Sequence, residues 1–251
     1  MSSFPTLFWV ALPYVSFIAF LVGMYWRYHY DAYGWTTRSS QMYESRLLRI
    51  GSPLFHFGIL MALAGHVVGL VIPESWTSAL GISEETYHVA AVAMGVVAAV
   101  MVVSGLAILI YRRRTQARVF GVTTRMDKLM YVLLGAVVLL GVFNTVGVNL
   151  LDLGGAHPGG YNYRESVAVW FRSIVFLHPQ PDLMTEAPWS FQAHAVVAMV
   201  LFAIVPFTRL VHIFSVPVGY VARPYIVYRS RDPRQSAARD PRRGWEPVRR
   251  P

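Results

Sequence analysis

Five long apolar runs, separated by polar segments, dominate the hydropathy pattern of this chain. They cover residues 4–26, 51–72, 87–111, 129–150 and 190–214. Each run exceeds the ~20 residues that an α-helix needs to cross a hydrocarbon layer of ~30 Å. The pattern therefore predicts an all-α integral membrane protein, a five-transmembrane-helix bundle. We expect one membrane domain over residues 1–225 and a basic, disordered cytoplasmic tail over residues 226–251.

Composition supports a membrane protein. Of the 251 residues, 55% are hydrophobic, and the mean hydropathy is +0.44, which is too apolar for an ordinary soluble domain. The first run has no basic residues before it and is followed by RYHYDAYGW instead of a small-residue cleavage site, so we expect a permanent span. The chain has no cysteine, which excludes disulfides, cysteine-ligated iron–sulfur clusters and covalently attached c-type haem.

Basic residues gather on one side of the predicted bundle. Of 22 lysines and arginines, 20 fall in the segments after runs one and three, at the end of run five and in the tail. The other two connections carry only Arg164 and Arg172, together with seven acidic residues. The positive-inside rule therefore places the N-terminus outside and the C-terminus in the cytoplasm. The net charge of +9 is thus a topology signal, and we expect no nucleic-acid partner.

Four of the eight histidines lie inside predicted spans, where an unpartnered imidazole is costly. The second run carries His56 and His66, about 15 Å apart in a helix, and the fifth run carries His194 and His212. Because these runs cross in opposite directions, depth pairs His56 with His212 and His66 with His194. The spacings of ten and eighteen residues differ, and helix tilt must absorb the difference. Eighteen residues make five whole turns, which predicts one shared face for His194 and His212.

Two depth-matched pairs favour two b-type haems, each iron held by two neutral imidazoles. A zinc or copper site would gather its ligands at one depth, often with cysteine or carboxylate. No run carries an acidic residue in its interior, which argues against a proton-coupled transporter. A haem-free transporter or assembly scaffold with structural histidines stays open as an alternative. We expect His29, His157 and His178 in loops, while His88 stays a candidate site residue.

Glycines accompany the histidines of the second run. Gly58, Gly65 and Gly69 would leave space for a flat macrocycle. Gly65 and Gly69 also form a GxxxG pattern, which is typical of close helix packing. Both interpretations stay open.

Three motifs carry a resemblance to a known family. They are RYHYDAYGWTTRSSQM after the first run, LFHFGIL and GHVVGL in the second, and FTRLVHIFSVPVGY closing the fifth. With the 18-residue step between histidines, they resemble the gamma subunit of respiratory nitrate reductase, a dihaem cytochrome b membrane anchor. The resemblance extends to about residue 225. The anchors of formate dehydrogenase or hydrogenase are the alternative, although they usually have four spans and different histidine spacing.

The resemblance implies a ligand set and a function. It assigns His56 and His212 to the iron of an inner haem b, and His66 and His194 to that of an outer one. It implies that quinol, in our interpretation menaquinol, is oxidised near the outer haem. Electrons would then pass to an iron–sulfur beta subunit and to a molybdenum-cofactor alpha subunit, which reduces nitrate. It places the chain in the bacterial cytoplasmic (inner) membrane, among membrane lipids.

The quinol pocket departs from the family pattern. Members of the family carry a lysine at the outer start of the third helix, whereas GISEETYHVA here has none. Either His88 takes over hydrogen bonding and proton acceptance, or the pocket is built differently. The candidate residues come from the outer ends of the second and third runs. They are Gly65, Gly69, Thr86, Tyr87 and His88.

Two further expectations concern the helix ends. In the long outer segment 150–189, ESVAVWFRSIVFL has the spacing of an interfacial amphipathic helix, which we expect to lie over the outer face. At the inner ends, Arg112 and Arg209 either pair with haem propionates or serve as topology anchors.

Overall fold

The computed structural model describes residues 3–31, 40–153, 160–215 and 222, and this part of the chain is helical without strands. Residues 1–215 form one compact unit that contains all the helices described below. Residues 216–251 form a second unit, of which only Ala222 is described. The predicted boundary at residue 225 and the predicted disordered tail therefore lie outside the described residues.

Five helices are long and apolar enough to cross a membrane, in agreement with the five predicted runs. The first is α1, and α2 and α6 are each extended at their ends by a short π-helical segment, η1 and η2. The elements of the five spans are α1 Ser3–Tyr30, α2 Arg46–His66 with η1 Val67–Val71, α4 Glu84–Thr115, α6 Arg125–Val142 with η2 Phe143–Val148, and α9 Trp189–Ile204 with η3 Val205–Phe207.

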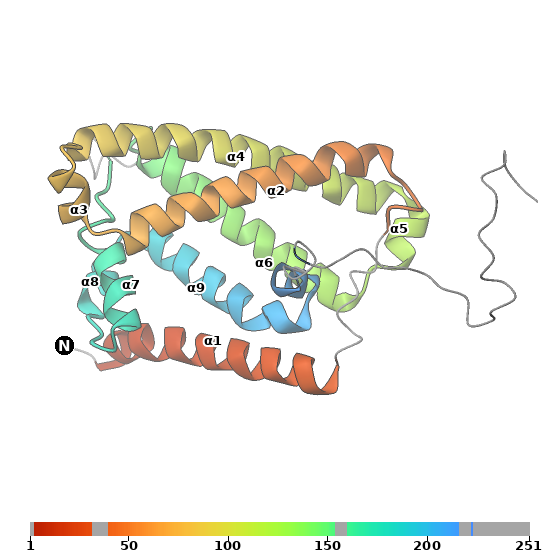
Figure 1. Cartoon of the computed structure of the whole chain (residues 1–251), viewed down its shortest axis with the longest axis horizontal. Coiled ribbons are helices and arrows are strands. Elements are labelled where there is room, and N and C mark those ends of the chain that lie inside the picture. The colour runs from red at the N-terminus through yellow and green to blue at the C-terminus, as the bar shows by residue number, and fades with distance from the viewer. Residues whose placement is uncertain (1–2, 32–39, 154–159, 216–221, 223–251) are drawn as a thin grey trace, which may run out of the picture. The chain divides into compact units, whose positions relative to one another are not determined.

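The spans form two packing groups, which are visible in Figure 1. In the first, α2 runs along α4, and glycines let the two backbones approach closely. A Cβ atom at Gly58 would lie 2.8 Å from Met101 Cβ, and one at Gly105 would overlap the backbone of Phe55. In the second group, α9 packs between α6 and α1.

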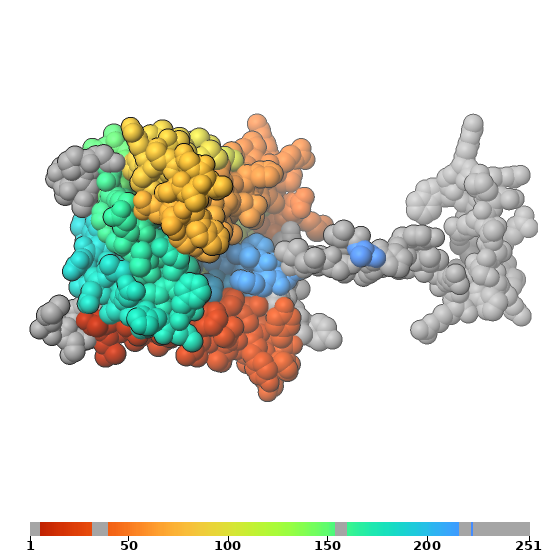
Figure 2. All heavy atoms as spheres, turned by 60° about the vertical axis from the view of Figure 1, so that its left-hand side comes forward, coloured from red at the N-terminus to blue at the C-terminus, as the bar shows by residue number. Residues whose placement is uncertain are grey.

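Short helices cover one end of the bundle, the end at which α2 finishes and α4 begins. They are α3 (Glu74–Ala79), α7 (Val167–Val175) and α8 (Asp182–Thr185). Figure 2 shows α3 in yellow-orange beside the teal segment that contains α7 and α8. The predicted helix over this end is therefore present as α7. Its Trp170 packs edge-to-face on Trp9 of α1, with ring centroids 5.7 Å apart, and donates its indole N–H to the Trp9 carbonyl at 3.2 Å.

The fifth span differs from the predicted continuous helix over residues 190–214. Its α-helix ends at Ile204, and after η3 the backbone is extended at Thr208 (φ −117°, ψ 177°). A separate 3-10 helix, η4 (Arg209–Phe214), follows and carries His212. Pro206 accounts for the break, because proline lacks the N–H that would bond the preceding turn. The Arg27 side chain of α1 donates a hydrogen bond to the Pro206 carbonyl at 2.5 Å, next to the break.

Candidate functional site

The four histidines of the spans lie in the two pairs that depth predicted. The His66 and His194 rings have centroids 6.0 Å apart and planes inclined by 18°. The His56 and His212 rings have centroids 6.2 Å apart and planes inclined by 65°. The first pair joins α2 to α9 and the second joins α2 to η4, so that residues more than 120 positions apart in the sequence face one another.

Backbone carbonyls fix the tautomer of three of the four imidazoles. Nδ1 lies 2.7 Å from the Ser52 carbonyl in His56, 2.7 Å from the Ala62 carbonyl in His66, and 2.6 Å from the Arg209 carbonyl in His212. A carbonyl oxygen only accepts, so Nδ1 carries the proton and a neutral ring keeps its lone pair on Nε2. The same anchoring is typical of histidines that ligate a metal through Nε2.

The fourth imidazole is held by packing. The Nδ1 atom of His194 is buried and makes no hydrogen bond of good geometry among the described residues, although the ring interacts with the Val137 backbone. Its ring lies against Gly141 of α6, where a Cβ atom would come within 3.1 Å of His194 Cε1. The glycine therefore makes room for this ring.

The ring separations suit a metal shared between two imidazoles. With nitrogen–metal bonds of about 2 Å, two imidazoles on opposite sides of one ion have ring centres roughly 6 Å apart. In the part of the chain that the structure describes, no three histidine, cysteine or acidic side chains cluster as a metal site would require. The donor sets are thus pairs of imidazoles, which are the axial ligands that b-type haem uses.

The break in the fifth span separates His212 from the helix that carries His194. His212 is on η4 and not on α9, so the prediction of a shared helix face with His194 does not apply. A buried ion pair holds η4 in place: Arg209 Nε lies 2.5 Å from Asp127 Oδ1, and Asp127 also caps the start of α6. The position of His212 is therefore tied to the N-terminus of α6.

The family model for the nitrate reductase gamma subunit matches residues 5–231. The chain belongs to this family. The nitrate reductase gamma chain of Bacillus subtilis is 41% identical over 223 residues, which are 89% of this chain and 97% of that protein. The respiratory nitrate reductase 2 gamma chain of Escherichia coli K12 is 33% identical over 225 residues, or 89% and 96% of the two chains.

The chain is also similar to part of a longer protein. The nitrate reductase-like protein NarX of Mycobacterium tuberculosis is 54% identical over 240 residues, which are 95% of this chain. The gamma-family chain spans 36% of the length of that protein. The chain has five apolar spans and belongs to a family of bacterial membrane subunits. It is therefore a multi-pass protein of the bacterial cytoplasmic (inner) membrane.

The glycines of α2 and η1 have different surroundings. Gly58 is buried against α4, and Gly69 lies under the Tyr163 side chain, where a Cβ atom would meet Tyr163 Oη at 2.7 Å. Gly65 has no atom within 4 Å of a Cβ position and precedes His66 directly. Only Gly65 of the three thus leaves open space beside a histidine.

The predicted quinol-pocket residues of α4 point in different directions. Thr86 is exposed and belongs to the N-terminal cap, where its N–H bonds Ser83 Oγ at 3.2 Å. His88 faces the end of η2, with Nε2 3.3 Å from the Asn149 carbonyl. Tyr87 instead faces Tyr163, with the two hydroxyl oxygens 3.4 Å apart. Tyr87 therefore contacts Tyr163, which in turn covers Gly69, whereas His88 lies next to Asn149.

Sequence reasoning missed a buried cluster around Arg164, which is only 2% exposed. Its guanidinium lies 2.8 Å from Glu84, donates to Thr77 Oγ1 at 2.9 Å and stacks 3.8 Å from the Tyr87 ring centroid. Burial raises the pKa of the neighbouring Tyr163 phenol well above its ordinary value. The signal in the sequence was an arginine, one of only two, in the otherwise acidic outer segments.

The two arginines singled out at the inner helix ends are paired with carboxylates. Arg209 pairs with Asp127, as described, and buried Arg112 lies 2.5 Å from Glu44 Oε2 and donates to Ser40 Oγ at 2.9 Å. Burial acts to raise the pKa of Glu44, but a backbone N–H and the Arg112 guanidinium outweigh it and hold this pKa below its ordinary value. Both pairs tie connecting segments to the spans.

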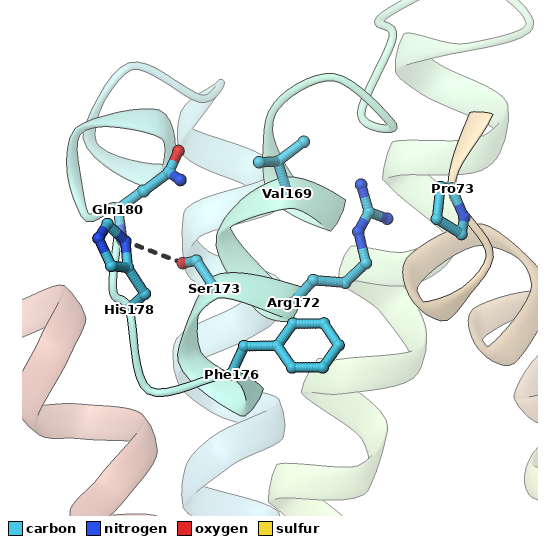
Figure 3. A pocket seen from close by; sticks show the side chains of 7 residues that line it. All are labelled: Pro73, Val169, Arg172, Ser173, Phe176, His178 and Gln180. Carbon is cyan, nitrogen blue, oxygen red and sulfur yellow. Dashed lines mark hydrogen bonds between the residues drawn. The ribbon is translucent and has the colours of Figure 1, made fainter. Parts of the chain in front are cut away.

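An open pocket of about 380 Å³ lies beside α7, apart from the histidine pairs (Figure 3). Arg172 crosses it and donates a hydrogen bond at 2.9 Å to the Leu70 carbonyl, at the end of the second span. Ser173 Oγ accepts the Gln180 backbone N–H at 3.0 Å and so folds the following loop back. The lining residues are Pro73, Val169, Arg172, Ser173, Phe176, His178 and Gln180.

Proposed function

We propose that the chain is the quinol-oxidising membrane subunit of a nitrate reductase, a dihaem cytochrome b. His66 and His194 would hold the outer haem b, and His56 and His212 the inner one. The observation that carries the proposal is the facing of these imidazoles in two pairs with ring centroids 6.0 and 6.2 Å apart. Relatives named as gamma chains of nitrate reductase support it.

Three of the four imidazoles have the hydrogen bonds that ligation through Nε2 requires. The carbonyls of Ser52, Ala62 and Arg209 hold Nδ1–H and leave Nε2 unprotonated, which orients each ring and increases its basicity. When bound, each haem iron accepts and releases one electron at a time. The neutral ligand set suits the apolar spans, because ionised groups are costly there.

The proposed orientation follows the charges at the two ends of the bundle. Arg112, Arg113 and Arg114 lie at the end of α4, next to α5 (Ala117–Gly121), and this end would face the cytoplasm. The opposite end, covered by α3 and α7, would face outward, so the His66–His194 pair is the outer one. Menaquinol, the substrate we favour, would reach it from the surrounding lipids.

Oxidation of quinol on one side and delivery of electrons on the other would separate charge. The quinol protons would leave on the outer side, while the electrons would leave on the cytoplasmic side to an iron–sulfur beta subunit and a molybdenum-cofactor alpha subunit. Each elementary charge moved across the full potential is worth about 2.3 kcal/mol per 100 mV.

Single histidine variants test this proposal. We expect the parent chain to bind two b haems, and His66→Ala and His212→Ala to bind one each, as measured by the haem-to-protein ratio and the reduced-minus-oxidised spectrum. His66→Ala should also abolish menadiol oxidation. His178→Ala, in an exposed loop beside α7, is the control and should keep both haems. A colourless parent protein would instead favour the haem-free transporter or scaffold.

The identity of the partner needs a separate measurement. We expect the chain to co-purify with cytoplasmic subunits that reduce nitrate when menadiol is the electron donor. Co-purification with a formate dehydrogenase or hydrogenase, and no nitrate reduction, would support the alternative anchor function and contradict this part of the proposal.

A further inference from the structure

The Tyr163 side chain lies across the outer end of the His66–His194 pair. Its hydroxyl covers Gly69, three residues beyond His66 and within one helical turn of about 5.4 Å. Its ring stacks on Phe191, three residues before His194 on α9, with centroids 6.5 Å apart and planes inclined by 22°. Tyr163 therefore contacts both helices that carry the outer pair.

Open space lies on the same side of α2, one turn inward from Tyr163. Gly65 and Gly69 are four residues apart and share a helix face, yet only Gly69 is covered, while a Cβ atom at Gly65 would meet nothing within 4 Å. Gly65 and the neighbouring residues of α2, including His66, are exposed. An apolar ring from the lipid can thus lie over Gly65, next to His66, with Tyr163 Oη at its outer edge.

The Tyr163 hydroxyl is suited to hydrogen bonding and not to acting as a base. It is held rigidly, because the next residue, Arg164, is buried and joined to Glu84, Thr77 and the Tyr87 ring. Burial keeps the phenol protonated by raising its pKa. Its one described hydroxyl neighbour, Tyr87 Oη, is 3.4 Å away, so Tyr163 keeps the capacity to donate to a ligand oxygen.

We propose that Tyr163 is the hydrogen-bonding residue of the quinol site, where its hydroxyl bonds a ring oxygen of a quinol that lies over Gly65 beside His66. The inference rests on the proposed quinol-oxidising function and adds a residue that lies outside both histidine-bearing helices. During quinol oxidation Tyr163 binds and orients the quinol and does not accept a proton from it.

Tyr163→Phe tests the inference, because it removes the hydroxyl and keeps the ring between Gly69 and Phe191. Tyr161→Phe is a matched control in the same loop: the Tyr161 ring also packs on Phe191, at 5.0 Å, but its hydroxyl bonds Ser166 Oγ at 2.7 Å. With the purified complex, the Kd of menadione should rise roughly two- to tenfold in Tyr163→Phe, as expected for one hydrogen bond. It should be unchanged in Tyr161→Phe.

A second variant keeps the inference testable if Tyr163→Phe does not assemble. Gly69→Ala places a methyl group 2.7 Å from Tyr163 Oη, so it should displace the hydroxyl and weaken menadione binding by a similar factor. In the Tyr163→Phe background the same change should weaken binding by less than it does in the parent, because the hydroxyl is already absent and only the ring contact at 3.0 Å stays. Menadione binding equal to the parent in Tyr163→Phe or Gly69→Ala would overturn the inference, as would equal weakening in Tyr161→Phe.

The haem spectrum separates this inference from the proposed function. If the parent carries two haems but Tyr163→Phe binds menadione as the parent does, only the inference fails. If the parent carries no haem but menadione binding still depends on Tyr163, the electron-transfer function fails and the ligand site stands.

Discussion

Replacement of Asp127 by asparagine tests whether the buried ion pair at the inner end positions His212. Asp127 is 4% exposed, and Arg209 bonds it twice, through Nε at 2.5 Å and Nη2 at 3.0 Å. Asparagine has nearly the same shape and keeps an oxygen that can accept the Thr124 N–H of the α6 cap. The substitution therefore removes the charge that Arg209 requires and replaces one of its two acceptor oxygens with an NH2 donor.

The expected cost follows from this geometry. Breaking a buried pair by removing one charge costs about 3–5 kcal/mol, and the lower end applies because the Arg209 side chain is 22% exposed. A loss of about 3 kcal/mol corresponds to roughly a hundredfold shift away from the native position of η4. Because His212 is three residues after Arg209, we expect Asp127→Asn to lose the inner haem and keep the outer one.

The assay is the haem-to-protein ratio together with the reduced-minus-oxidised spectrum, which should fall from two haems to one. Glu44→Gln is the matched control, since Glu44 and Arg112 form another carboxylate–arginine pair at 2.5 Å on the same end of the bundle without contacting a histidine. It should lower thermal stability and leave both haems. Two haems in Asp127→Asn, or one in Glu44→Gln, would refute the role assigned to the Asp127 pair.

Two further predictions concern other packing and charge contacts. Gly141→Val should displace the His194 ring, 3.1 Å from a Cβ at that position, and lose the outer haem spectrum, whereas Gly135→Val, with no atom within 4 Å, should not. The pKa of Glu44 in the folded chain lies below 4.5, its ordinary value. The pair with Arg112 therefore stabilises the fold above about pH 4.5, and this contribution is lost as the pH falls through the folded pKa. The difference in thermal unfolding midpoint between the parent and Glu44→Gln should therefore shrink below pH 4.5, and a constant difference down to pH 3.5 would contradict this.

The five spans and the two histidine pairs were predictable because they follow from the order and hydropathy of residues along the chain. A run of more than twenty apolar residues indicates a membrane helix regardless of its neighbours, and the order of the spans determines which ligands share a depth. The family motifs point the same way. The break in the last span was not predicted, although Pro206 was a signal for it; the run is apolar throughout, and hydropathy does not register a lost backbone hydrogen bond.

The surroundings of single residues were harder to predict, because they depend on which helix lies opposite. Gly58, Gly65 and Gly69 look alike in the sequence, but α4 covers the first, Tyr163 covers the third, and the second is open. His88 and Tyr87 are adjacent, yet the roughly 100° rotation per residue in a helix turns them to different neighbours. Such distinctions require the tertiary contacts of the loop at residues 160–166.

Each histidine pair takes one member from α2 and the other from residues after position 190. During synthesis at 5–20 residues per second, on the order of ten seconds pass between the emergence of His66 and that of His194. Throughout this interval the second span carries His56 and His66 without their facing partners. If the two pairs hold haem as proposed, cofactor loading would follow synthesis of the last span, and a chain that stops after the fourth span would have neither ligand pair.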